Sequence, residues 1–241
     1  MEPPVQWILP LGLRCLLVDR LKSANLRIHA LPFDWIYATL PLIRLIILSN
    51  FTPLLHQGSY QYTSPPKQLG IHPRVGHKDY AAELSRCSAD GAMFVHHDPL
   101  TDEGMRHLSR AVARFRRIIA TGDRKLFLTV GIGGWCTGTS GFEDVLRLFE
   151  CLKGSTSNFS YVAVDCRLGV GVSEARLLHK EGDEGGCRCK IYQLDCVGGN
   201  SGQKFERVED ADALSALLLV PDTGEGRIGT PYKFNLKKLY I

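Results

Sequence analysis

Two short apolar runs joined by an amphipathic segment constrain the fold of this chain more than any other feature. The runs, residues 125–130 and 160–165, have the length and composition of strands that are buried on both faces. Between them lie a glycine-rich loop, residues 131–141, and a segment with helical spacing from about residue 142 to 152. This order predicts a β-α-β unit with parallel strands.

The same alternation of strands and helices extends through most of the chain. Further strands are predicted at residues 5–9, 92–96 and 190–194, and further helices at residues 15–21, 35–49, 101–120 and 211–218. We therefore predict an α/β fold with a mostly parallel central sheet and helices on both faces, in three layers. A long irregular loop is predicted near residues 52–88, which are rich in proline and glycine.

The whole chain, residues 1–241, is predicted to form a single α/β domain. Residues from about 219 to 241 are polar and rich in turn-forming residues and suggest an extended tail, in which residues 233–240 are a candidate closing edge strand.

Charge and hydropathy argue against several classes of protein. The formal net charge is +4 and the basic residues are scattered, whereas a nucleic-acid binder usually has a clustered basic face. The first residues lack the positive region of a secretory signal, and the most apolar stretch, residues 35–48, is too short to span a bilayer. We expect a cytoplasmic protein without a membrane span, and we leave its oligomeric state open.

Three cysteines near the end of the chain raise the question of a metal. Cys187, Cys189 and Cys196, with His179 upstream, could bind zinc, but structural zinc prefers wider gaps within each ligand pair. Free thiols or an adventitious disulfide explain the pattern more simply. We predict no metal and no organic cofactor.

The segment Leu11-Gly12-Leu13-Arg14-Cys15 places a thiol at the start of a predicted helix. A helix N-terminus carries a partial positive charge that favours the thiolate. His96 and His97 end a predicted strand and could supply the imidazole that thiol catalysis requires. The alternative is that Cys15 packs as a small hydrophobic side chain.

Three carboxylates are candidates for orienting the imidazole. Asp98 follows His97 directly, and neighbours on a strand point to opposite faces, so it fits only if the strand has ended. Asp165 ends a buried strand, where an orienting carboxylate of a parallel sheet is expected. Asp34 is the third candidate, although we favour it as the N-cap of the helix at 35–49.

The glycine-rich loop allows a different function. A dinucleotide fingerprint needs G-x-G-x-x-G, and Cys136 stands where the third glycine should be. A plain strand-to-helix turn is the simpler interpretation, with Gly133 and Gly134 bordering a site at the carboxyl ends of the strands. The alternative function is therefore a non-hydrolytic, transferase-like or binding domain for a sugar or nucleotide.

Four motifs in order resemble a known domain family. They are Leu11-Gly12-x-x-Cys15, Pro32-Phe33-Asp34-Trp35, Phe94-x-x-His97-Asp98, and a following helix with Arg110, Arg114 and Phe115. Together, from about residue 8 to 130, they resemble a family described as "putative papain-like cysteine peptidases".

This resemblance implies a thiol nucleophile at Cys15 and a general base at His97. Papain-like enzymes usually carry a glutamine six residues before the cysteine, where this chain has Leu9, so the backbone N–H of Cys15 is the one oxyanion donor we can name.

We predict a thiol hydrolase acting on an amide or ester bond of a peptide-like or small-molecule substrate. The predicted catalytic residues are Cys15, His97, Asp98 and Asp165. The predicted binding residues are Asp34, Trp35, His96, Gly133 and Gly134.

Overall fold

The computed structural model describes residues 4–64, 73–133, 139–182, 186–200 and 204–219. Gly134, the predicted tail from residue 220 onward and the edge strand predicted at 233–240 lie outside these residues.

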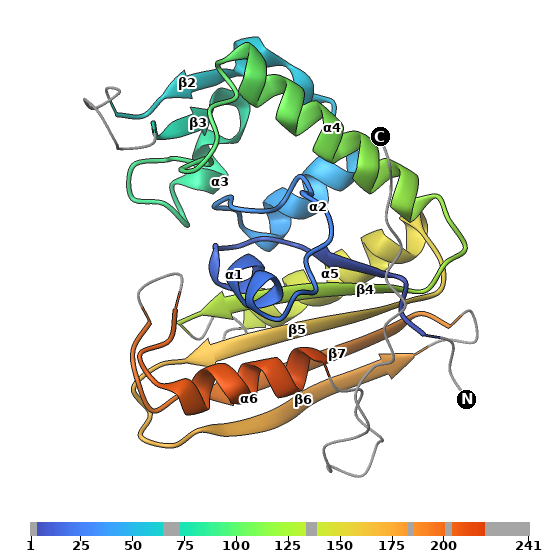
Figure 1. The fold of residues 1–241 in the computed structure, drawn as a ribbon, viewed down its shortest axis with the longest axis vertical. Helices are drawn as coiled ribbons and strands as arrows, with labels where there is room; N and C mark the ends of the chain where they lie inside the picture. The colour runs from blue at the N-terminus through green and yellow to red at the C-terminus, as the bar shows by residue number, and fades with distance from the viewer. Residues whose placement is uncertain (1–3, 65–72, 134–138, 183–185, 201–203, 220–241) are drawn as a thin grey trace.

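A five-stranded sheet in the order β1-β4-β5-β7-β6 forms the centre of the molecule (Figure 1). The first four strands run parallel, and β6 runs antiparallel to β7. The predicted mostly parallel sheet is confirmed. The strands span Trp7–Pro10 (β1), Lys125–Ile132 (β4), Phe159–Arg167 (β5), Glu174–Gly182 (β6) and Arg188–Asp195 (β7).

Helices cover both faces of this sheet, so the fold has three layers. Buried residues of α1 and α6 pack on one face, and those of α2, α4 and α5 pack on the other. Figure 1 shows α1 and α6 in front of the sheet and α5 behind it. The helices span Leu16–Ser23 (α1), Leu40–Leu48 (α2), Asp102–Ile119 (α4), Thr139–Ser155 (α5) and Val208–Leu219 (α6).

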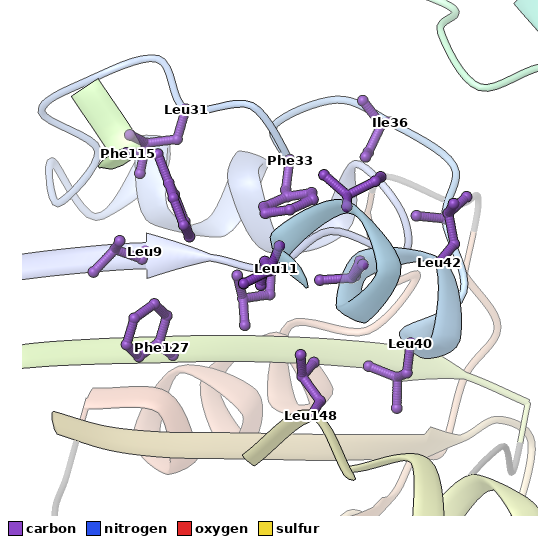
Figure 2. Packing of buried hydrophobic residues seen from close by; sticks show 14 of the residues in the cluster. Leu9, Leu11, Leu31, Phe33, Ile36, Leu40, Leu42, Phe115, Phe127 and Leu148 are labelled. Atoms are coloured by element: carbon purple, nitrogen blue, oxygen red, sulfur yellow. The ribbon is translucent and has the colours of Figure 1, made fainter. Parts of the chain in front are cut away.

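Aromatic packing holds the segment around Phe33 against the face of the sheet that α4 covers. Phe33 packs against Phe115 of α4 with ring centroids 5.6 Å apart, and Phe115 lies 6.4 Å from Phe127 of β4. Figure 2 shows Phe33 above Leu11, with Phe127 on the strand below. Burying one such ring contributes roughly 1.5–3 kcal/mol, so this packing fixes the chain immediately before Asp34.

The helix predicted at residues 35–49 begins later, at Leu40. Thr39 caps it by accepting a hydrogen bond from the N–H of Leu42. Pro41, in the first turn, has the fixed φ that suits a helix start. The prediction that Asp34 caps this helix is therefore wrong, because residues 36 and 37 are engaged in β-bridges instead.

Within the predicted strand at residues 92–96, the structure has β-bridges at Phe94 and no regular strand. Phe94 bridges Ile36 on one side and Val75 on the other. The chain then turns into α4, which Thr101 caps through Gly104 as predicted.

The region predicted as a long loop near residues 52–88 contains several short elements in irregular chain. A two-stranded antiparallel sheet joins β2 and β3. These elements are η1 (Pro53–Leu55), η2 (Gln57–Ser59), β2 (Tyr60–Tyr62), β3 (Val75–His77), η3 (Lys78–Tyr80) and α3 (Ala81–Leu84).

Strand β6 was not predicted from the sequence. It is an edge strand whose side chains are nearly all exposed, so it has no buried face to produce an apolar pattern.

Candidate active site

Three segments that carry the predicted site residues meet in one small ladder. Leu13 forms a parallel bridge with Tyr37, and its neighbour Ile36 forms an antiparallel bridge with Phe94. The N–H of Tyr37 donates to the carbonyl of Met93 at 2.9 Å. Gly12 permits the close approach, because a Cβ there would lie 2.9 Å from the carbonyl oxygen of Phe33. The ladder thus joins the Cys15, Asp34 and His97 segments.

Cys15 immediately precedes α1 and is only 5% exposed. Burial raises the pKa of the Cys15 thiol to about 11, although Arg14 lowers it and Asp19 raises it further. The expected helix-start effect, which favours the thiolate, is therefore outweighed by desolvation. At neutral pH this side chain is a thiol.

His97 lies in a small enclosed space that we call the imidazole cavity. Its ring stacks on that of His107 from α4, with centroids 4.5 Å apart and planes at 24°. The space is about 10 Å³, close to the minimum that holds one water molecule. The imidazole cavity is lined by Leu31, Pro32, Asp34, Phe94, His97, Pro99, Gly104, His107, Leu108 and Ala111.

Asp34 brings a buried carboxylate to the same cavity. Its Oδ2 accepts hydrogen bonds from Arg27 Nε at 2.9 Å and from the N–H of Leu31 at 3.1 Å. Its Oδ1 is buried and has no hydrogen-bond partner among the described residues. Burial raises the pKa of Asp34 to about 6, against the opposing effect of Arg27 and Leu31. Asp34 and His97 thus line the same cavity.

His107 was missed by the sequence reasoning. It lies on α4 three residues after Gly104 and four before Ala111, a spacing that places all three on one helix face. Burial lowers the pKa of His107, and the nearby guanidinium groups of Arg110, Arg114 and Arg27 lower it further.

Cys15 and His97 leave the ladder in opposite directions. The Leu13–Tyr37 bridge is parallel, so Cys15 runs toward the Thr39 end of that segment. The Ile36–Phe94 bridge is antiparallel, so His97 runs toward the Asp34 end. The structure therefore brings Asp34 and His97 to one cavity, the lining of which does not include Cys15.

The two other predicted carboxylates have different surroundings. Asp98 accepts hydrogen bonds from the Tyr62 hydroxyl at 2.9 Å and from the N–H of Leu100 at 3.0 Å, so it organises the turn before α4. Asp165 is fully buried on β5, in register with Gly131 of β4. These contacts place neither carboxylate in the imidazole cavity lining.

The remaining predicted binding residues flank these elements. Trp35 adopts a left-handed φ of 58°, which costs a non-glycine residue about 1 kcal/mol, and its ring lies 5.1 Å from that of His96. Gly133 has a φ of 100° at the end of β4, and its N–H donates to the carbonyl of Cys166. Gly133 therefore belongs to a strand-end turn.

A larger space, which we call the strand-end cavity, opens at the carboxyl ends of β1 and β4. It measures about 250 Å³ and contains Cys87, a second residue that the sequence reasoning missed. No periodic pattern marks Cys87, which follows the short helix α3. The strand-end cavity is lined by Leu13, Arg14, Ala38, Thr39, Leu40, Pro41, Arg86, Cys87, Gly131, Ile132, Gly141 and Asp144.

The late cysteines do not gather at one place. Cys187 and Cys189 belong to the core on the α4 face, and Cys196 belongs to the core on the α1 face. Within the described ranges, no three histidine, cysteine or acidic side chains are grouped so that they could hold a metal ion.

One protein-family model matches this chain. The sequence model of a family described as "putative papain-like cysteine peptidase" matches residues 6–132, more than half of the chain. The chain belongs to this family. No curated protein and no solved structure matches the sequence. In the described part of the chain, no helix combines the length and hydropathy needed to cross a bilayer.

The family match ends at the last residue of β4. The matched residues therefore include the ladder, His97 and His107 of the imidazole cavity, and the wall of the strand-end cavity up to Ile132. The strands β5 to β7, which complete the sheet, lie beyond the matched residues.

Proposed function

We propose that this member of the papain-like family is a thiol-dependent hydrolase of an amide or ester bond. Cys15 attacks the carbonyl carbon, His97 accepts the thiol proton and returns it to the leaving group, and Asp34 orients His97. The observation that carries the proposal is the shared cavity of the Asp34 carboxylate and the His97 imidazole, joined by the ladder to the Cys15 segment.

The protonation state of Cys15 determines how such a reaction proceeds. Because its pKa is about 11, the thiol has to lose its proton during the attack and not before substrate arrives. The base and thiol leave the ladder in opposite directions. Proton transfer therefore requires the Cys15 turn and the His97 segment to approach one another when substrate binds.

An acyl-enzyme assay tests this proposal. Incubation with p-nitrophenyl acetate should yield a thioester on Cys15, detected by peptide mass spectrometry, with release of nitrophenol. Cys15→Ala should abolish both signals, and His97→Ala and Asp34→Asn should slow acylation by at least about a hundredfold. Cys151→Ala, in α5 and away from the ladder, serves as the matched cysteine control. Undiminished acylation in Cys15→Ala, or in His97→Ala, would refute the mechanism.

The strand-end cavity favours a second candidate function. Ligands of α/β proteins usually bind outside the carboxyl ends of the strands, which is where this cavity opens. In this alternative the protein is a non-hydrolytic or transferase-like domain that binds a small ligand such as a sugar or a nucleotide. Ligand binding that survives Cys15→Ala and His97→Ala, in a protein that shows no acylation, would favour this function over the first.

A further inference from the structure

We propose that the strand-end cavity binds a compact small molecule with a terminal oxyanion, a carboxylate or a phosphate, and that Arg14 is the residue that holds the anion. This inference rests on the second candidate function, that the cavity takes a ligand, and it adds the chemical class of that ligand. It holds whether or not Cys15 is catalytic.

The charges around the cavity point to Arg14. Arg86 is paired with Glu83 at 3.2 Å, and the Thr39 hydroxyl donates to the same carboxylate at 3.0 Å. This network pairs Arg86 with a carboxylate, although the Arg86 side chain is itself 68% exposed. Arg14, by contrast, is exposed, and its side chain has no hydrogen bond or ion pair to any residue that the structure describes. A guanidinium at a cavity wall presents several donors to a carboxylate or phosphate.

The acidic residue in the lining does not cancel this charge. Asp144 lies 3.9 Å from Arg147 of the same helix, and Arg44 also acts on it. Burial raises the pKa of Asp144, against the opposing effect of Arg147 and Arg44. Asp144 is therefore compensated from its own side, whereas Arg14 remains available for a ligand.

Size and polarity restrict the ligand further. A cavity of about 250 Å³ lies just below the usual range for drug-sized ligands, so it suits a compact molecule better than a dinucleotide. Leu13, Ala38 and Ile132 provide an apolar wall beside Arg14. A short apolar body with an anionic end matches this combination of surfaces.

Cys87 offers a direct readout of the cavity. Iodoacetate and iodoacetamide have nearly the same size and differ in charge, so the ratio of their alkylation rates at Cys87 reports the local potential. Burial raises the pKa of Cys87 to about 11 while Arg14 lowers it. Loss of Arg14 changes the thiolate fraction for both reagents equally, so the ratio is unaffected by that change. Cys151, on which Arg44 and not Arg14 acts, is a second thiol whose ratio Arg14→Gln should leave unchanged.

We expect the iodoacetate-to-iodoacetamide ratio at Cys87, measured by mass spectrometry, to be about threefold higher in the wild type than in Arg14→Gln. Arg14→Gln should abolish this preference, Arg14→Lys should retain most of it, and Arg117→Gln on α4 should leave it unchanged. Sodium butanoate should protect Cys87 from iodoacetamide in the wild type and not in Arg14→Gln, whereas butanamide should protect in neither.

The possible results test two claims separately: that the cavity binds a ligand, and that it selects anions. A ratio that does not change in Arg14→Gln overturns the anion site. Equal protection by butanoate and butanamide means that the cavity takes ligands without selecting anions, which also overturns it. No reaction of Cys87 with either reagent even at pH 10, where a thiol of pKa about 11 is partly ionised, shows that the cavity is closed, and then the second candidate function fails as well. Acylation of Cys15 is measured separately and bears only on the hydrolase.

Discussion

The imidazole cavity and the strand-end cavity lie at opposite ends of the same ladder and differ in nearly every physical property. The first is about 10 Å³ and encloses a buried carboxylate against two stacked imidazoles. The second is about 250 Å³, and its lining includes the exposed Arg14, whose side chain has no hydrogen bond or ion pair to a described residue. In the small cavity, burial shifts the titration of Asp34 and His107 in opposite directions.

This difference shows what each space can do. A cavity that holds one water molecule cannot admit a substrate, but it can fix a carboxylate and an imidazole for proton transfer. An open cavity at the strand ends can admit a ligand, and the conformations of its lining side chains are less restricted. We therefore expect substitutions in the imidazole cavity to affect folding and titration strongly, and substitutions in the strand-end cavity to affect binding alone.

The largest effect should come from Gly104→Ala in the wall of the imidazole cavity. A Cβ at this position would lie 1.8 Å from the carbonyl oxygen of Asp98, so backbone has to move. We expect a loss of about 3 kcal/mol in the free energy of unfolding, measured by urea denaturation. Gly154→Ala in α5, where no atom lies within 4 Å of the added Cβ, should gain up to about 1 kcal/mol. Equal effects of the two substitutions would show that the Asp98 turn is not tightly held.

The next effect is a pH dependence of stability that Asp34 causes. Its pKa is about 6 in the folded protein, against 3.8 for an aspartate exposed to water as in the unfolded chain, so the folded state takes up a proton first as the pH falls. The free energy of unfolding should therefore gain up to roughly 3 kcal/mol from this group between pH 6 and pH 4. Asp34→Asn should lack this gain. Parallel curves of stability against pH for the two proteins would contradict the burial of an ionised Asp34.

A smaller effect is expected in the titration of His107. Burial and the three nearby arginines lower its pKa, and Asp34 lines the same cavity. Imidazole NMR signals should show His107 titrating below 6.5, and Arg110→Gln should raise that pKa by a fraction of a unit. Arg117→Gln is the charge-matched control. A His107 pKa at or above 6.5 in the wild type would mean that the ring is not enclosed. Because folding lowers this pKa, protonation of His107 costs stability as the pH falls below 6.5.

The smallest effect is expected for Arg14→Gln. Arg14 is exposed and makes no described contact through its side chain, so the free energy of unfolding should change by no more than about 0.5 kcal/mol. Thermal and urea denaturation measure this directly. A loss comparable to that of Gly104→Ala would show that Arg14 has a structural role, and the contrast between the two cavities would disappear.

Part of the fold was predictable because some elements are defined by local patterns. The strands β4 and β5 are buried on both faces, which leaves continuous apolar runs in the sequence. Helix α4 has an amphipathic pattern and a capping threonine, Thr101. The start of α2 was predicted wrongly because Asp34 is as good a capping residue as Thr39, and only the bridges at Ile36 and Tyr37 exclude it.

The sequence by itself determined which chemical groups the chain contains and in what order, including the thiol of Cys15, the carboxylate of Asp34 and the imidazole of His97. It also determined that they belong to motifs of one family. Only the tertiary structure decided that Asp34 shares a cavity with His97, and that Cys15 is not part of its lining. The reason is that burial and bridge direction depend on segments far apart in the chain. Burial raises the thiol pKa to about 11, although a helix start alone would lower it.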